Sequence, residues 1–126
     1  MGIGPCKVVV VDDNEDALDT LVLFLNKTGH RAIAVSDPFK AEQTIEAFEP
    51  HIVFLDIAMP GLDGWELARR LRAQYPEEAM KLVAITAYGA DRDRVASRKA
   101  GFDAHIVKPA DLDMVDSIMR QFFSAG

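Results

Sequence analysis

His51-Ile52-Val53-Phe54-Leu55-Asp56-Ile57-Ala58-Met59-Pro60 is the stretch from which the rest of this chain is interpreted. A run of consecutive apolar residues, bounded by polar and turn-forming residues, predicts a short strand buried on both faces of a sheet. A carboxylate directly at the end of such a strand needs an explanation, because burying an unpaired charge costs several kcal/mol. Asp56 is therefore the first candidate for a reacting group.

The composition limits the class of protein. With 126 residues, 49% hydrophobic and 27% charged, the chain is expected to form one soluble domain over 1–126. A net charge of −6 argues against direct nucleic-acid binding, because phosphate backbones favour a basic surface. The lone Cys6 excludes an internal disulfide and favours a cytoplasmic setting. No apolar run reaches the roughly 20 residues that cross a bilayer. We expect no membrane contact by this domain, although a parent protein could be membrane-anchored.

Strand-like and helix-like segments alternate five times along the chain. The expected strands are 7–11, 31–35, a central strand through Leu55, 81–85 and 104–107, and each is followed by an amphipathic helical segment. On the third of these helices, Arg69, Arg70 and Arg72 are expected to face solvent. The alternation predicts an α/β fold, a doubly wound five-stranded parallel sheet with helices on both faces and right-handed crossovers.

Polar residues follow four of the predicted strands at their carboxyl ends, where open parallel sheets place their active crevice. They are Asp12 and Asp13 after the first strand, Asp56 after the third, Thr86 after the fourth and Lys108 after the fifth. Three carboxylates in one crevice repel each other, so the group is stable only with a cation among them. Oxygen ligands favour Mg²⁺, with Mn²⁺ as a substitute, whereas no Cys/His set converges there to bind zinc.

A metal beside a carboxylate, a hydroxyl and an ammonium group is suited to handling a phosphoryl group. Asp56 would attack phosphorus, while Mg²⁺ and Lys108 would neutralise the equatorial oxygens. Thr86 would donate a hydrogen bond to one of those oxygens. Because lysine acts here as a compact point charge, arginine is expected to be a poor replacement.

With these residues in place, the chain resembles a receiver domain of the two-component response-regulator family over nearly its whole length. The matching motifs are Val9-Val10-Val11-Asp12-Asp13-Asn14, Leu55-Asp56-Ile57-Ala58-Met59-Pro60-Gly61-Leu62-Asp63-Gly64, Thr86-Ala87 and Gly101-Phe102-Asp103-Ala104-His105-Ile106-Val107-Lys108-Pro109. The resemblance implies a flavodoxin-like sheet with strand order 2-1-3-4-5. It also implies phosphorylation of Asp56 by the phosphohistidine of a histidine kinase or a histidine phosphotransfer domain.

The same resemblance implies a ligand set for the metal. Asp13, Asp56 and the backbone carbonyl of Ala58 would bind Mg²⁺ directly, and Asp12 would act mainly through a water molecule. A cis peptide bond before Pro109 is also expected in this family, and X-Pro bonds adopt it at small cost.

Three positions bear on switching and on the lifetime of the phosphoryl group. Phosphate on Asp56 would draw Thr86 toward it and open room for residue 105, which is Tyr or Phe in most receivers and His105 here. An imidazole is smaller, polar and titrates near neutral pH, so a switching role and a half-exposed strand residue both stay open. Ala58 and Tyr88 flank the expected path of hydrolytic water, and neither can orient it. Slow autodephosphorylation is therefore expected, with Tyr88 as a partial lid.

The residues of these motifs most resemble those in receiver domains of hybrid sensor histidine kinases. A stand-alone single-domain response regulator is the alternative. We expect a monomer or weak dimer that catalyses only its own phosphorylation and dephosphorylation and is not a conventional enzyme. A phosphatase resembling the haloacid dehalogenase family would need a second acid two residues after its nucleophile, where this chain has Ala58. A nucleotide or flavin binder would need a glycine loop after the first strand. A phosphorylation-independent scaffold would typically have lost an acid or the lysine, and none is missing.

Overall fold

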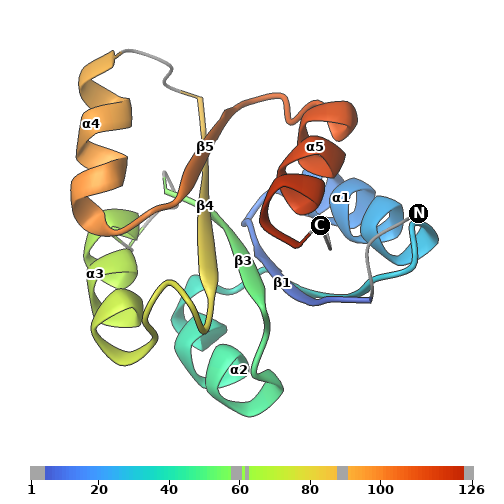
Figure 1. The fold of residues 1–126 in the computed structure, drawn as a ribbon, viewed down its shortest axis with the longest axis horizontal. Helices are drawn as coiled ribbons and strands as arrows, with labels where there is room; N and C mark the ends of the chain where they lie inside the picture. The colour runs from blue at the N-terminus through green and yellow to red at the C-terminus, as the bar shows by residue number, and fades with distance from the viewer. Residues whose placement is uncertain (1–4, 58–60, 62, 88–90, 124–126) are drawn as a thin grey trace.

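The computed structural model describes residues 5–57, 61, 63–87 and 91–123, the side chains of 91–93 excepted. In this part of the chain, five strands form one parallel sheet in the order β2-β1-β3-β4-β5 (Figure 1). They are β1 (Lys7–Val11), β2 (Arg31–Val35), β3 (Ile52–Asp56), β4 (Lys81–Thr86) and β5 (Ala104–Val107). The predicted fold class and strand order are confirmed.

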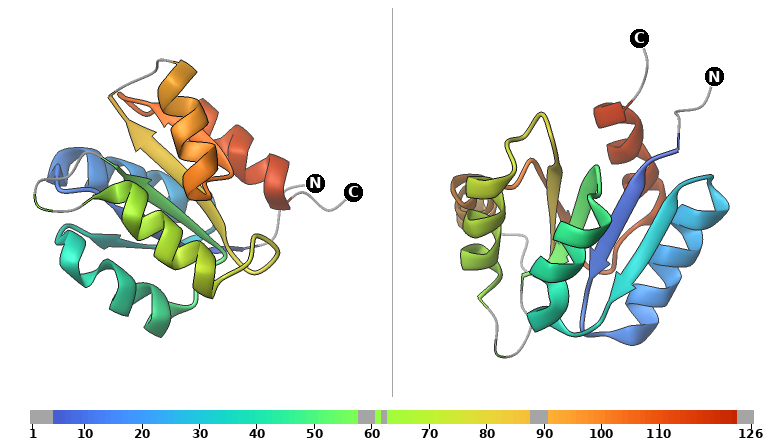
Figure 2. Two further views of the ribbon diagram at one scale, coloured as in Figure 1. Left: turned by 90° about the vertical axis from the view of Figure 1, so that its left-hand side faces the viewer. Right: turned by 90° about the horizontal axis from the view of Figure 1, so that it is seen from below.

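Helices cover both faces of the sheet (Figure 2). They are α1 (Glu15–Lys27), α2 (Ala41–Phe48) with the 3₁₀ turn η1 (Pro38–Lys40) before it, α3 (Gly64–Gln74), α4 (Asp91–Ala100) and α5 (Leu112–Phe123). Buried residues of α1 and α5 pack on one face, and those of α2, α3 and α4 on the other. None of the helices in the described ranges is long and apolar enough to cross a membrane.

The central strand β3 shows why its sequence is continuously apolar. Val53 and Leu55 belong to the core beneath α2 and α3, whereas Ile52 and Phe54 belong to the core beneath α1 and α5. Successive side chains of a strand point to opposite faces, so a strand covered on both sides needs apolar residues at every position. Asp56 is the first residue of this strand that has a charge to place.

Arg72 does not face solvent as expected for α3. Its guanidinium group donates to the carbonyl oxygens of Gly101 at 2.9 and 3.0 Å, Met80 at 2.8 Å and Tyr75 at 3.1 Å, and pairs with Asp103 at 2.6 Å. The other two arginines of that run are exposed, as predicted. Periodicity identified the polar side of α3 correctly, but the turns before β4 and β5 cover one part of that side.

His30, directly before β2, is buried and neutral. Its Nδ1 accepts a hydrogen bond from the backbone N–H of Cys6 at 3.2 Å, and only an unprotonated nitrogen can accept. Burial lowers the pKa of His30 from its ordinary value of 6.5, although Asp116 partly opposes this effect. Between the two pKa values the unfolded chain binds more protons than the folded protein, so the free energy of unfolding rises with pH.

The stability contributed by neutral His30 should thus be complete above about pH 6.5 and decline as pH falls toward the folded-state pKa. Thermal unfolding measured from about pH 8 down to about pH 5 should show a steeper decline for wild type than for His30→Gln, which cannot titrate there. Parallel curves for the two proteins would show that His30 does not titrate differently in the folded state.

Candidate phosphoacceptor site

The site lies at the edge of the sheet where the strands end. Asp12 follows β1, Asp56 closes β3, Thr86 closes β4 and Lys108 follows β5. Parallel pairing brings these ends together: Asp56 lies opposite Ile85 of β4, and the N–H of Lys108 donates to the carbonyl of Thr86 at 2.7 Å. The polar residues that were predicted at the ends of separate strands are therefore neighbours in space.

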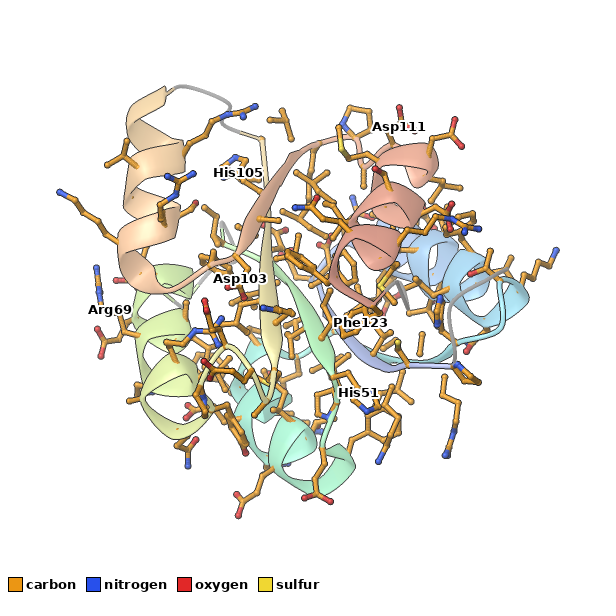
Figure 3. All side chains as sticks on the ribbon, viewed as in Figure 1. His51, Arg69, Asp103, His105, Asp111 and Phe123 are labelled. Atoms are coloured by element: carbon orange, nitrogen blue, oxygen red, sulfur yellow. The ribbon has the colours of Figure 1, made fainter. Side chains whose placement is uncertain are left out.

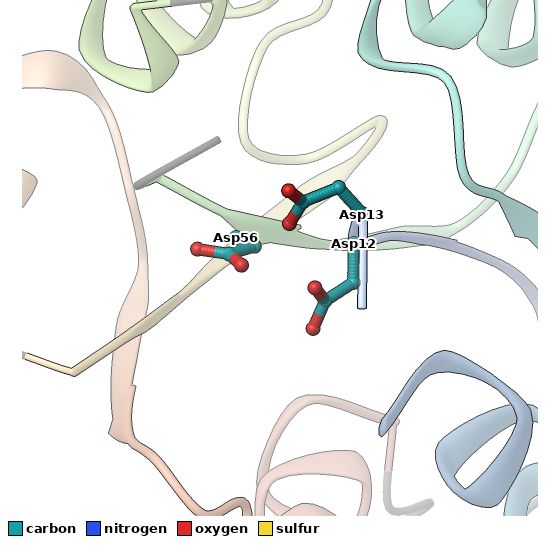
Figure 4. Close-up of side chains that lie close together, drawn as sticks. All are labelled: Asp12, Asp13 and Asp56. Atoms are coloured by element: carbon teal, nitrogen blue, oxygen red, sulfur yellow. The ribbon is translucent and has the colours of Figure 1, made fainter. Parts of the chain in front are cut away.

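Three carboxylates converge at this edge. Oxygen atoms of Asp12, Asp13 and Asp56 lie within 4.8 Å of one another (Figure 4). Asp12 and Asp56 are each 3% exposed, whereas Asp13 is exposed. The cluster thus has two buried members and one that faces solvent, and a hard divalent cation is the ligand that suits such an oxygen set.

Lys108 supplies the positive charge beside this cluster. Its Nζ lies 2.8 Å from Oδ2 of Asp56 and 3.2 Å from Oδ2 of Asp12. Burial works to lower the pKa of Lys108, but the hydrogen bonds and charges of Asp56 and Asp12 outweigh it and raise the pKa. The ammonium group is consequently held in its charged form. The peptide bond between Lys108 and Pro109 is cis, as the resemblance implied.

Burial and the neighbouring carboxylate change the pKa of Asp12. Its pKa is raised, first by burial and then by the neighbouring Asp56, although the backbone N–H of Asn14, donating at 2.9 Å, acts in the opposite direction. A raised pKa means that the folded protein resists ionising this carboxylate. A cation bound close to Asp12 and Asp56 would remove that resistance, so the chemistry of the donor set fits a divalent metal.

The two predicted switch residues occupy neighbouring strands. Thr86 is fully buried at the end of β4. His105 is half-buried on β5 and lies between that strand and α4, where its Nδ1 is 3.1 Å from Oγ of Ser97 (Figure 3). Sequence reasoning missed Ser97, which the helical spacing with buried Ala100 could have placed on the inner side of α4.

Ala58 and Tyr88 lie outside the described residues. The metal-binding role expected of the Ala58 carbonyl stays a prediction. The same holds for the slow hydrolysis that we expect from these two positions.

A parallel sheet with acids and a lysine gathered at its carboxyl edge defines the class of protein. Residues 8–120 match the model of the response regulator receiver domain family. The chain belongs to this family and is a phosphoacceptor receiver domain of the kind found in two-component response regulators. Receiver domains of this family bind Mg²⁺ at an acidic pocket and interact with histidine kinases or phosphotransfer proteins.

Similar proteins include an uncharacterized 14.6 kDa protein in the sodA1 3′ region of Leptolyngbya boryana. It is 34% identical over 91% of this chain and 88% of its own length. A response regulator from Thermotoga maritima is 26% identical with a TM-score of 0.84, covering 98% of this chain and all of that one. DrrB, a Thermotoga maritima OmpR/PhoB homologue, is 25% identical with a TM-score of 0.82 over 94% of this chain. Our chain spans only 52% of DrrB, but 97% of a BeF₃-activated DrrB receiver domain.

Proposed function

We propose that Asp56 accepts a phosphoryl group from the phosphohistidine of a histidine kinase or a histidine phosphotransfer domain. The observation that carries this proposal is the ammonium group of Lys108 at 2.8 Å from Asp56, beside two further carboxylates. A lysine that served only to neutralise one acid would not need to contact both Asp12 and Asp56. The arrangement suits a group that must bind both a divalent cation and a phosphoryl group.

In the proposed step, a carboxylate oxygen of Asp56 forms a bond to phosphorus while the phosphorus–nitrogen bond of the donor breaks. The electron pair of that bond goes to the imidazole nitrogen, and the donor leaves as neutral imidazole because its other ring nitrogen carries a proton. Lys108 neutralises charge on the transferring oxygens, and the hydroxyl of Thr86 donates a hydrogen bond to one of them. Mg²⁺, or Mn²⁺ in its place, would supply the remaining charge neutralisation when bound.

Asp13, Asp56 and the carbonyl of Ala58 would hold the metal directly, with Asp12 acting through water. Mg²⁺ should therefore stabilise the folded protein, by about 2.7 kcal/mol when its concentration is about 100 times its Kd. Asp13→Asn should lose most of this stabilisation, because it removes a ligand without creating a cavity. The measurement is thermal unfolding across a Mg²⁺ titration.

Asp19→Asn is the matched control for this metal experiment. Asp19 is an exposed acid of α1 outside the carboxylate cluster, so its replacement changes the net charge equally. Equal Mg²⁺ stabilisation of both variants would contradict the proposed ligand set.

The phosphoryl analogue BeF₃⁻ tests the acceptor itself. A receiver domain of DrrB is activated by BeF₃, and we expect the same complex to bind Asp56 here in the presence of Mg²⁺. Fluorine NMR should show bound BeF₃⁻ for wild type and none for Asp56→Ala. Bound fluoride signals of equal intensity in the variant would place the acceptor elsewhere.

The parent context that we propose is a stand-alone single-domain response regulator. The 14.6 kDa relative supports it, because the alignment covers 88% of that protein and leaves little room for another domain there. The amino-acid sequence of the motifs supports the other expected context, a hybrid sensor histidine kinase. In either context we propose a cytoplasmic domain, monomeric or weakly dimeric, that contacts no nucleic acid or membrane and is not a conventional enzyme. The presence of every acid and the lysine argues against a phosphorylation-independent scaffold.

A further inference from the structure

Ser97 forms a buried polar contact that the proposed phosphoryl transfer does not use. Its side chain lies on the inner side of α4, and the residue is 2% exposed. Its Oγ is 3.1 Å from Nδ1 of His105, so the hydroxyl and the ring form a hydrogen bond between α4 and β5. A buried hydrogen bond between two elements fixes their relative position more narrowly than apolar contact does.

Helix α4 presents few buried side chains to the sheet among those that the structure describes. Of its side chains that the structure describes, only Ser97 and Ala100 are buried, and neither is a large apolar residue. Helix α3 presents Leu67 and Leu71 to the core, each 1% exposed. The Ser97–His105 bond therefore makes up a larger share of the attachment of α4 than one hydrogen bond usually does.

The strand that carries His105 also carries the lysine of the acceptor site. His105 and Lys108 are three residues apart, at the middle and just past the end of β5. The backbone N–H of Lys108 donates a hydrogen bond to the carbonyl oxygen of Thr86, and its Nζ donates one to Oδ2 of Asp56. A displacement at the carboxyl end of this four-residue strand is thus passed to His105 over a short, hydrogen-bonded backbone.

A phosphoryl group on Oδ2 of Asp56 would cause such a displacement. The Nζ of Lys108 lies 2.8 Å from this oxygen, so phosphorus bonded to it would need the place of the ammonium group, and Lys108 would move to pair with the new oxygens. The His105 ring has space to respond, because a hollow of about 150 Å³ lies beside it, bordered by Arg94 and Arg98 of α4.

We infer that Ser97 is a positioning residue for the acceptor site. Its hydrogen bond to His105 holds β5 and α4 in the arrangement that pairs Lys108 with the unphosphorylated carboxylate of Asp56. Phosphorylation of Asp56 breaks this bond. The inference rests on the proposed function of Asp56. Because the bond stabilises only one of two arrangements, its removal must strengthen binding of the phosphoryl analogue by the same factor by which it shifts the equilibrium.

The test is the affinity of the Mg²⁺-loaded protein for BeF₃⁻, measured by fluorine NMR titration. Ser97→Ala should bind BeF₃⁻ between about 2-fold and about 10-fold more tightly than wild type, the range expected for one hydrogen bond. His105→Phe should tighten binding similarly, and the double variant should show little further change, because both single changes remove the same bond. Ser117→Ala, an exposed serine on α5, should leave the affinity unchanged.

Unchanged or weaker binding in Ser97→Ala, or full additivity in the double variant, would overturn the inference. Nitrogen NMR of the imidazole supplies a readout that a purely structural role would not move: the Nδ1 shift of His105 should change on adding BeF₃⁻ to wild type and much less in Ser97→Ala. If Ser97→Ala does not fold, His105→Phe decides by the same affinity criterion. Absence of BeF₃⁻ binding by wild type would instead refute the proposed function, and this inference with it.

Discussion

Lys108→Arg should slow phosphorylation of Asp56 by a small acyl phosphate by about 100-fold, the loss typical of removing one preorganised electrostatic group. The Lys108 ammonium lies within 3.2 Å of two nearly buried carboxylates, Asp12 and Asp56. A guanidinium group is planar, larger and spreads its charge, so it cannot occupy the same point between them. The positive charge is retained, but its position relative to the transferring oxygens is lost.

The measurement is the initial rate of phosphorylation at saturating Mg²⁺, followed by intact mass. Lys99→Arg on α4 is the control, since that lysine is exposed and the ion pairs of Asp12 and Asp56 are formed by Lys108. A rate for Lys108→Arg within about threefold of wild type would show that charge alone, without the geometry of lysine, is sufficient.

Arg72→Ala should lower the free energy of unfolding by about 3 kcal/mol, as expected when one partner of a largely buried ion pair is removed. The side chain of Arg72 is 20% exposed and that of its partner Asp103 is 11% exposed. The change would leave Asp103 without its cation and would remove the donor for the carbonyl oxygens of Gly101 and Met80. The melting temperature should fall by roughly 10 °C.

Arg70→Ala supplies a matched control on the same helix. Arg70 pairs with Glu42 of α2, but its side chain is 51% exposed, and exposed ion pairs contribute at most about 1 kcal/mol. Denaturant unfolding of both variants tests the comparison. Similar losses for the two arginines would contradict a special role for the Arg72 network in joining α3 to the turns before β4 and β5.

The convergence of the predicted site residues could be foreseen because a simple rule connects it to the sequence. Parallel strands end at one edge, so acids and a lysine after separate strands had to meet, as Asp12, Asp56 and Lys108 do. The apolar run of β3 likewise predicted a strand covered on both faces.

Contacts that depend on how a helix meets a turn were not predictable. The prediction of which side of α3 is polar was correct. The sequence carries no signal, however, that the turn at Gly101 folds over Arg72. The bond between Ser97 and His105 likewise depends on the distance between α4 and β5, which periodicity does not specify. Helical periodicity identifies a face and leaves its neighbours undetermined.

Asp56 is tested most directly as the phosphoacceptor by the intact mass of the protein after incubation with Mg²⁺ and a small phosphodonor, with Asp56→Asn alongside. Wild type should gain one phosphoryl group, the gain should disappear when the metal is chelated beforehand, and Asp56→Asn should gain none. An equal gain in Asp56→Asn, or no gain in a folded wild-type protein that binds Mg²⁺, would contradict the assignment of Asp56 as the phosphoacceptor.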